Sequence, residues 1–282
     1  MTNEISKIVD YVQLERIEDN IFRGESRDLG TPQVYGGQVL GQAIQAAQLT
    51  VEGRPVHSVH CYFLRRGDFN APIIYEVDRS RDGASFTARR VVAIQHGRPI
   101  FTMSASFQAP EEGLDHGMLL EMPPLPKEGE HRAPPMPIIG QRNMHRPHSE
   151  FQIYEVASQD QTDPMSFQWW VKTRHALPDN QDTHRSVLAY ISDFGLLTAS
   201  LLPHGITTEE SYDTTPNFIF ASIDHAIWFH RPFRVDEWLL YYIRPVSSSG
   251  ARGLSIGSLY DPQGTLVATT IQEGLARQRT RD

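Results

Sequence analysis

The chain reads His60-Cys-Tyr-Phe-Leu-Arg-Arg66, then a stretch rich in β-branched and aromatic residues, and then Phe101-Thr-Met-Ser-Ala-Ser-Phe-Gln108. The same order returns further along, where His225-Ala-Ile-Trp-Phe-His-Arg231 is followed by Leu266-Val-Ala-Thr-Thr-Ile-Gln272. The two His-to-Gln intervals differ by a single residue. A repeat of this length indicates one supersecondary unit used twice, so differences between the copies should show where one copy carries chemistry.

A helical pattern precedes each copy. Gly36 and Gly37 open a stretch rich in Ala, Gln and Leu whose apolar residues recur at helical spacing. These apolar positions are Val39, Leu40, Ala43, Ile44 and Ala47. In the second half, the apolar spacing predicts a helix from about His184 to Leu201.

Runs of β-branched and aromatic residues, separated by turn signals, predict four strands after each helix. In the first half they are Val56–Leu64, Ile73–Asp78, Phe86–Gln95 and Pro99–Phe107. In the second half they are Phe218–Phe229, Trp238–Arg244, Gly253–Leu259 and Leu266–Gln272. A long helix wrapped by a curved antiparallel sheet is the hotdog arrangement. The sequence therefore predicts an α+β fold, a double hotdog with two such repeats in one chain.

Prolines are concentrated between Pro110 and Pro147, with acidic residues among them. Proline at that density blocks helix interiors and central strands, so this region is interpreted as a linker. The predicted organisation is an N-terminal hotdog over 1–109, a proline-rich linker over 110–150 and a C-terminal hotdog over 151–282.

Composition narrows the class of protein. The chain has 282 residues, of which 39% are hydrophobic, enough to bury one large core or two modest ones. Its first residues lack the pattern of a secretory signal, and no apolar stretch is expected to span a bilayer, so we expect a cytoplasmic protein without a membrane partner. Cys61 is the only cysteine, which excludes an internal disulfide. The C-terminal Arg279–Asp282 is not a Ser-Lys-Leu peroxisomal address.

The net charge of −8 argues against a nucleic-acid partner, because such binding depends on many cationic contacts to phosphate. A small polyanionic ligand could still use local arginines. The candidates are Arg65, Arg66, Arg89, Arg90, Arg231, Arg252 and Arg277.

Four blocks of the sequence resemble the type II acyl-CoA thioesterases. They are Ser222-Ile-Asp-His-Ala-Ile-Trp-Phe-His-Arg-Pro-Phe233, Val34-Tyr-Gly-Gly-Gln-Val39, His57-Ser-Val-His-Cys-Tyr-Phe-Leu-Arg65 and Thr270-Ile-Gln-Glu-Gly274. The resemblance covers nearly the whole chain outside the proline-rich region. It implies hydrolysis of fatty acyl-CoA to a free fatty acid and CoA, without metal or organic cofactor, by a homo-oligomer such as a dimer or tetramer.

The resemblance also implies a catalytic site. Asp193, Ser222 and Gln272 stand where the family keeps the three side chains that hold and activate the hydrolytic water. Serine replaces the family's usual threonine at the middle position. Both residues carry one hydroxyl that donates and accepts, so water positioning should survive, although Ser222 has more rotamer freedom.

The chemistry of these residues agrees with that role. Asp193 lies in the apolar helical stretch 187–197, where partial desolvation should raise its pKa and strengthen it as a base. A thioester is a reactive electrophile with a good leaving group, so a water aligned by a carboxylate and two neutral polar groups is sufficient. Backbone N–H groups near Gly36 and Gly37 are candidate donors to the oxyanion.

An ungapped overlay of the halves puts Gln45 opposite Asp193 and His57 opposite Ser222, so only the C-terminal copy carries the catalytic carboxylate. The first half should then shape the acyl pocket. The residues expected to contact substrate are Gly36, Gly37, His57, Arg65 and Arg231.

Two other motifs are set aside. Gly253-Leu-Ser-Ile-Gly257 fits the nucleophile elbow, but that motif needs a strand-to-helix turn and a strand and hairpin follow here, so Ser255 is not expected to be a nucleophile. His57 and His60 should point to opposite faces of a strand, and no cluster of carboxylates or cysteines joins them, so no metal site is expected.

Two other functions stay open at this point. One is a hotdog enoyl-CoA hydratase, which would use an Asp and His pair, and the other is a non-catalytic acyl-CoA binding module. Release of free thiol from acyl-CoA would distinguish hydrolysis from both.

Overall fold

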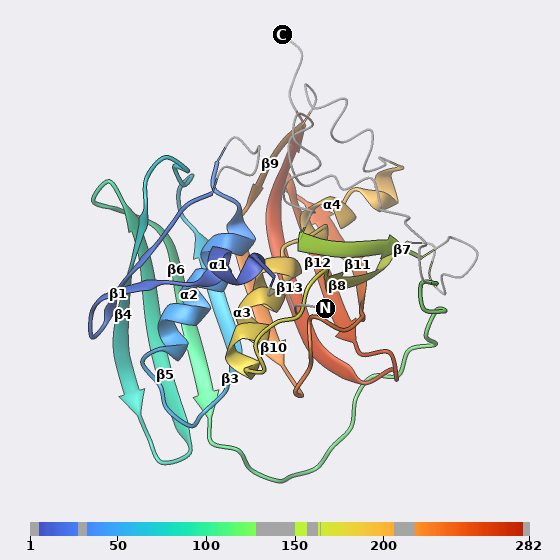
Figure 1. Ribbon diagram of the computed structural model, residues 1–282. Helices are drawn as coiled ribbons and strands as arrows, with labels where there is room; N and C mark the ends of the chain where they lie inside the picture. The colour runs from blue at the N-terminus through green and yellow to red at the C-terminus, as the bar shows by residue number, and fades with distance from the viewer. Residues whose placement is uncertain are drawn as a thin grey trace.

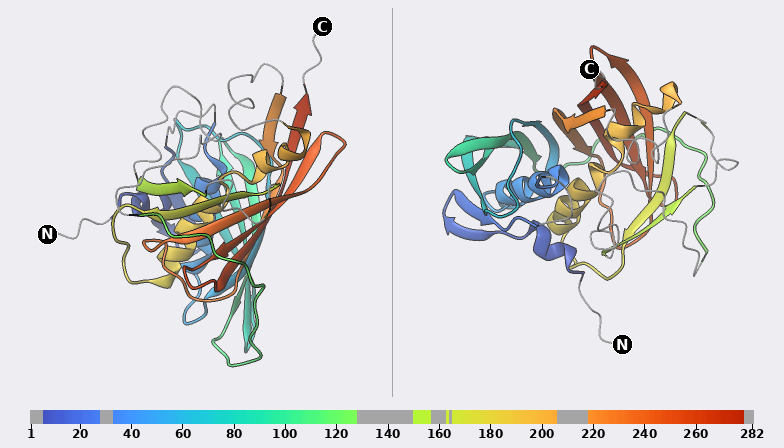
Figure 2. Two further views of the ribbon diagram at one scale, coloured as in Figure 1. Left: turned by 90° about the vertical axis from the view of Figure 1, so that its right-hand side faces the viewer. Right: turned by 90° about the horizontal axis from the view of Figure 1, so that it is seen from above.

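The computed structural model describes residues 6–27, 33–127, 150–156, 163, 165–205 and 218–278. Its main feature is one 13-stranded sheet that curls around two central helices, α2 (Gly36–Gln48) and α3 (Gln181–Ser192) (Figures 1 and 2). All described strand pairs are antiparallel. The α+β class is therefore as the sequence predicts.

The predicted strands are found in both halves. The first half contains α1 (Ile8–Val12), β1 (Glu15–Glu18), β2 (Ile21–Gly24), α2, β3 (Val56–Phe63), β4 (Ile73–Asp82), β5 (Phe86–Gln95) and β6 (Arg98–Gln108). The second half contains β7 (Phe151–Glu155), β8 (Phe167–Thr173), α3, α4 (Leu196–Ala199), the 3-10 turn η3 (Leu202–His204), β9 (Phe218–Ser222), β10 (Asp224–Phe229), β11 (Leu239–Ser249), β12 (Arg252–Tyr260) and β13 (Leu266–Gln278). The sequence did not predict β1, β2, β7 or β8.

The strand order joins the halves at the centre of the sheet. It runs β1-β2-β4-β5-β6-β3-β10-β13-β12-β11-β8-β7, and β9 pairs with β13. β3 and β10 meet antiparallel with Ala226 opposite His60, so the two repeated His-containing segments are neighbours. Outward from this pair, strands of the two halves follow in corresponding order.

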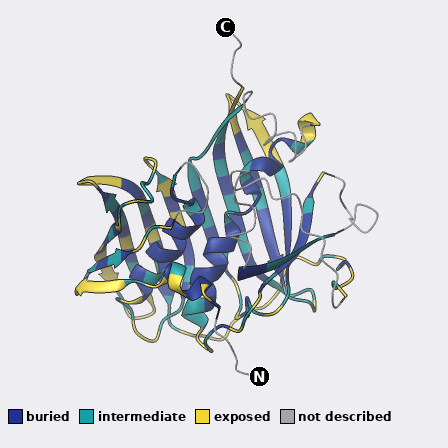
Figure 3. Ribbon diagram, turned by 45° about the horizontal axis from the view of Figure 1, so that its top comes forward, coloured by how far each residue is buried: buried dark blue, intermediate teal, exposed yellow. Residues whose placement is uncertain are grey.

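The two central helices approach closely because glycine lies between them. A Cβ added to Gly37 would lie 2.4 Å from the backbone oxygen of Tyr190, and one added to Gly41 would lie 2.8 Å from that of Ser186. The start of α2 therefore touches the end of α3, and the helices run antiparallel. Both are largely buried (Figure 3), and one hydrophobic cluster draws residues from both halves.

The prediction of one continuous helix over 184–201 is wrong, because the helix is interrupted near its middle. α3 ends at Ser192, Asp193 is its C-cap, and α4 starts at Leu196. Gly195 between them has φ +77°, a left-handed conformation that favours glycine and ends helices. A Cβ there would also lie 2.3 Å from the Trp169 ring. The predicted strand 218–229 is likewise divided, into β9 and β10.

The segment Gln181–His204 is long and apolar enough to cross a membrane by length and composition alone, contrary to the expectation from the sequence. However, 78% of its most apolar window is buried inside the protein. Its apolar character therefore serves packing in the core.

The described part of the proline-rich region, up to residue 127, contains no helix or strand, as predicted. It nevertheless packs against the second half: Trp170 donates its indole N–H to Pro124 O (3.0 Å), and Leu120 and Met122 contact a cluster around Tyr242. Residues 128–149 of the predicted linker lie outside the described residues. This region is a covering segment of the sheet as well as a connector.

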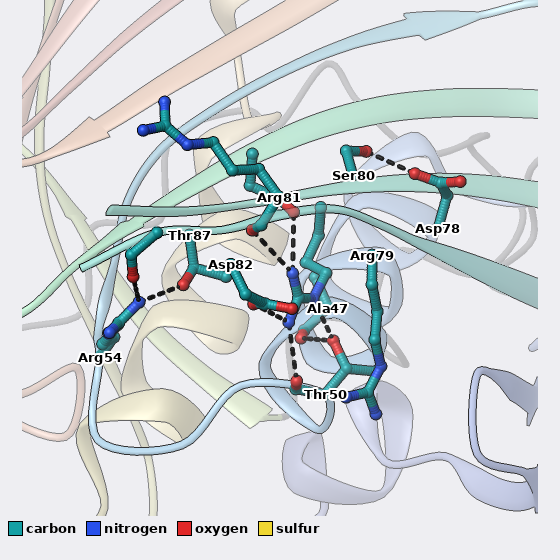
Figure 4. A network of polar contacts seen from close by, with 12 residues as sticks. Ala47, Thr50, Arg54, Asp78, Arg79, Ser80, Arg81, Asp82 and Thr87 are labelled. Carbon is teal, nitrogen blue, oxygen red and sulfur yellow. Dashed lines mark hydrogen bonds and ion pairs between the residues drawn. The ribbon is translucent and has the colours of Figure 1, made fainter. Parts of the chain in front are cut away.

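Arg89, one of the arginines considered for a polyanionic ligand, is buried and belongs to a polar network beside the C-terminal end of α2. Figure 4 shows this network, with Thr50, Asp82 and Thr87 labelled. Its side chain is 3% exposed and donates to Thr50 Oγ1 (2.9 Å), Thr50 O (3.2 Å) and Asp82 Oδ1 (2.7 Å). Arg54 extends the network with a bond to Thr87 Oγ1 (2.5 Å). These contacts fasten the loop after α2 to β4 and β5, so Arg89 is structural.

Candidate active site

The three side chains predicted to act together lie in direct contact. Gln272, in β13, donates through Nε2 to Asp193 Oδ1 (2.6 Å) and to Ser222 Oγ (3.1 Å). Asp193 comes from the end of α3 and Ser222 from the end of β9. One amide therefore bridges a carboxylate and a hydroxyl delivered by three different elements.

The start of α2 completes the surroundings of the carboxylate. The backbone N–H of Gly37 donates to Asp193, and a Cβ added to Gly36 would lie 2.8 Å from Asp193 Oδ2. Gly37 N–H was predicted as an oxyanion donor, but it is directed at the carboxylate. Glycine is needed at position 36 because a Cβ there would press on the carboxylate, and at position 37 because a Cβ there would meet the backbone oxygen of Tyr190 in α3.

The carboxyl of Asp193 has an altered proton affinity. Burial raises its pKa to about 6, while the hydrogen bonds from Gln272 and from Gly37 N–H act in the opposite direction. Desolvation prevails because it disfavours the charged form more than two hydrogen bonds favour it. At neutral pH the group is ionised yet basic enough to accept a proton from water.

A cavity of about 230 Å³ opens beside this cluster. Ser222 and Gly36 lie on its lining, and Phe63, Ile100 and Phe101 form an apolar wall contributed by the first half. Arg65 and Arg66 also line it. A ligand with an apolar tail and an anionic part could bring a carbonyl group to the hydroxyl of Ser222.

Comparisons with known proteins show the family to which the chain belongs. Residues 150–275 match the family described as acyl-CoA thioesterase, and residues 25–108 match the acyl-CoA thioesterase N-terminal domain. The chain is 38% identical to acyl-CoA thioesterase 2 of Haemophilus influenzae, over 98% of this chain and 99% of that protein. It is 36% identical to acyl-coenzyme A thioesterase 8 of Rattus norvegicus, over 97% and 90%. The chain belongs to the acyl-CoA thioesterase family.

Solved structures place this acyl-CoA thioesterase among hotdog folds. The acyl-CoA thioesterase II TesB2 of Mycobacterium marinum matches with a TM-score of 0.80 and 37% identity, over 98% of each chain. A hot dog fold protein of Alicyclobacillus acidocaldarius matches with a TM-score of 0.72 at 17% identity, over 96% of this chain and 98% of that one, a likeness that concerns the fold alone. The enzyme is thus a thioester hydrolase built on the hotdog fold, as the sequence predicts.

Two residues predicted to contact substrate do not join the cluster. His57 contacts Ser106 Oγ through Nε2 (2.8 Å) and packs against Phe86, at the end of β3 opposite to Phe63. The adjacent Ser58 pairs with Ser106 of β6, whereas Phe63, which lines the cavity, lies at the opposite end of β3. The ungapped overlay that set it opposite Ser222 ignored the break between β9 and β10.

Arg231 is also occupied elsewhere. It donates to Leu266 O (2.7 Å) and His116 O (2.8 Å) and forms an ion pair with Asp115. These contacts hold the proline-rich region against the sheet. Arg65, in contrast, lines the cavity and donates to Pro99 O (2.6 Å), so it stays a candidate for contact with CoA.

Sequence reasoning missed a second layer of polar contacts behind Asp193. Tyr241 donates to Ser192 O (2.7 Å) and shares a hydrogen bond with Thr270 Oγ1 (2.9 Å). Ser192 Oγ in turn contacts His225 Nε2 (3.0 Å). The alternation along β13, which puts Thr270 and Gln272 on one face, is the signal that could have revealed part of this layer.

Within the described residues, no group of three or more His, Cys, Asp or Glu side chains could hold a metal ion. Cys61 is buried, and burial together with Asp193 raises the pKa of its thiol well above the usual range.

Proposed function

We propose that this acyl-CoA thioesterase hydrolyses fatty acyl-CoA with a water molecule activated by Asp193 and held by Ser222 and Gln272. The observation that supports this assignment is the contact of the three side chains beside a cavity, with an Asp193 carboxyl whose pKa is raised to about 6. The apolar wall of Phe63, Ile100 and Phe101 suits an aliphatic acyl chain.

The proposed reaction has two steps. Asp193 removes a proton from water as the water oxygen forms a bond to the thioester carbon, and the carbonyl oxygen becomes an oxyanion. The carbon–sulfur bond then breaks, and the CoA thiolate receives the proton held by Asp193. Ser222 accepts a hydrogen bond from Gln272, so its own O–H is available to orient the water or the carbonyl.

The N-terminal end of α2 supports stabilisation of the oxyanion. The first turn of a helix carries unpaired N–H groups and the positive end of the helix dipole. Gly36 lies on the cavity at this point, and Tyr35 makes no side-chain cap. Because Gly37 N–H is directed at Asp193, the N–H of Gly36 is the donor we assign to the oxyanion.

We further propose that the chain is a double hotdog. The corresponding strand order on either side of the β3–β10 pair and the antiparallel α2–α3 pair support two repeats. The domain limits, a cytoplasmic location and association into a dimer or tetramer stay predictions from the sequence.

The charge state of His225, whose ring contacts Ser192 next to Asp193, does not support the hydratase alternative. Burial lowers the pKa of His225 to about 3, and its Nε2 contacts Ser192. A histidine that is neutral and tied behind the site is a poor proton donor to a substrate.

Free-thiol release from a panel of saturated and 2-unsaturated acyl-CoAs tests the proposal. We expect thiol release that depends on Asp193, with Arg66→Gln as a variant outside the triad that affects mainly KM. Loss of the enoyl chromophore without thiol release would contradict hydrolysis, and tight binding with no turnover would point to a binding module.

A further inference from the structure

Ser255 lies in the middle of β12, directly beside the proposed triad. In the antiparallel β12–β13 pair it is the residue opposite Gln272. Directly opposed residues in such a pair project to the same face of the sheet. Both side chains are fully buried, so Ser255 shares an interior position with the amide that bridges Asp193 and Ser222.

Each of these neighbours carries one oxygen without a hydrogen-bond partner in the described part of the chain. They are Ser255 Oγ and Gln272 Oε1. A buried hydroxyl and a buried amide oxygen are costly to leave unpaired, and they are complementary because the first can donate and the second accepts. The Nε2 atom of the same amide is already used twice, toward Asp193 and Ser222.

We propose that Ser255 is a positioning residue, whose hydroxyl donates to Gln272 Oε1 and holds the amide with its NH₂ group toward Asp193 and Ser222. This inference rests on the proposed function of the triad and extends it by one residue. A small rotation of the two side chains is sufficient, because they are direct cross-strand neighbours. Ser255 touches neither water nor substrate in this role.

The Ser255 hydroxyl matters because the Gln272 amide has an alternative orientation. Without the Ser255 hydroxyl, Gln272 Oε1 could be hydrated only by turning the side chain toward the cavity. That movement would remove the Nε2 bonds to Asp193 and Ser222. Since the bond from Gln272 lowers the pKa of Asp193, its loss should raise that pKa further.

The pH dependence of activity reports this change in the pKa of Asp193, because the neighbouring titratable groups keep their charge over the same pH range. The titratable groups that face Asp193 are Cys61 from β3, Tyr190 from α3 and Tyr241 from β11. Burial holds the pKa of each above its usual range, so none of the three changes charge between pH 5 and 8.

The test measures thiol release from acyl-CoA across pH for Ser255→Ala, Gln272→Ala and the double variant. For Ser255→Ala we expect kcat to fall about threefold to tenfold, the factor expected of one hydrogen bond, with KM little changed. The acidic limb, which is the decline of kcat/KM toward low pH, should move to higher pH. In the Gln272→Ala background, Ser255→Ala should have no further effect, because the group that it positions is absent.

Ser166→Ala is the matched control. Ser166 is a buried serine just before β8, and it accepts a hydrogen bond from the amide of Gln168 (3.0 Å), a buried glutamine within β8. Its removal should leave kcat and the acidic limb as in the wild type. Ser255→Thr, which keeps the hydroxyl, should restore the position of the limb.

A wild-type kcat and limb in Ser255→Ala would overturn the inference, and so would a loss larger than that of Gln272→Ala, which a positioning role cannot produce. If Ser255→Ala does not fold, Ser255→Cys keeps a similar volume with a weaker donor, and a wild-type limb there overturns it equally. If Asp193→Asn and Gln272→Ala themselves leave thiol release intact, it is the proposed function that fails.

Discussion

The two ends of the α2–α3 helix pair differ in what they leave open. At one end, Gly36 and Gly37 at the start of α2 meet Asp193 at the end of α3, and a cavity opens beside them. At the other end, Gln48 near the end of α2 donates to Asp182 O (3.2 Å) and Ser186 Oγ (3.1 Å). Side chains fill the second end, whereas glycines leave room at the first.

This difference supports the proposal that a chain of two repeats carries a single site. The buried Arg89 network lies beyond the filled end and fixes Thr50, just after α2. At the open end, the corresponding place after α3 is taken by Asp193 and Gly195. The overlay from sequence matched Gln45 with Asp193, but Gln45 lies one turn inside α2, where it accepts from Ser186 (3.1 Å).

The largest effect should come from Asp193→Asn. The substitution keeps the shape and removes the base, so kcat for thiol release should fall on the order of a hundredfold or more. Thermal unfolding at pH 7 is the control: because the folded-state pKa of Asp193 is raised, ionisation there destabilises the fold, and the Asn variant should unfold at a higher temperature. Near-normal turnover of Asp193→Asn would contradict the assignment of the reaction to the open end of the helix pair.

The pH dependence of kcat/KM should follow the ionisation of Asp193. Asp193 is active when ionised, and burial raises its pKa to about 6. The value of kcat/KM should therefore decline below pH 6, by about tenfold for each pH unit lower. A profile that is flat from pH 7 to pH 4.5 would show that another group activates the water.

Gly37→Ala tests the close approach at the open end. The added Cβ would lie 2.4 Å from the Tyr190 backbone oxygen, so the helices must separate. We expect a loss of about 1 to 3 kcal/mol in the free energy of unfolding, together with several-fold lower turnover. Gly113→Ala, which adds a Cβ with nothing within 4 Å, is the matched control. Equal behaviour of the two variants would contradict the role of helix contact.

The smallest effect on turnover should come from the filled end. Gln48→Ala removes bonds to Asp182 O and Ser186, so it should lower the free energy of unfolding by about 1 to 2 kcal/mol. Thiol release should stay within about twofold of the wild type, since no reacting group lies there. A loss of turnover comparable to that of Asp193→Asn would mean that both ends take part in the reaction.

Much of the fold could be predicted from local patterns. Helical spacing after Gly36 and β-rich runs such as Phe86–Gln95 depend on neighbouring residues, so they are visible in the sequence and the structure reproduces them closely. The strands β1, β2, β7 and β8 were missed; they are the two outermost strands at each end of the sheet, and their place depends on the sheet that the rest of the chain builds. The break at Asp193 was missed because apolar spacing continues through Phe194 and Leu197 across the left-handed Gly195.

The candidate site could likewise be predicted only in part from the sequence. Asp193, Ser222 and Gln272 were named from motifs, and the structure brings them into contact. Arg231 was named for its charge and His57 from the ungapped overlay, and long-range contacts hold both elsewhere.

The sequence by itself determined the helix after Gly36, most of the strands and the choice of three polar residues that prove to be in contact, since periodicity and motif are properties of adjacent residues. Only the tertiary structure decided that the start of α2 meets the end of α3, and that Ser255 lies opposite Gln272. Helix approach and strand register depend on packing between segments far apart in the chain, and no local preference specifies them.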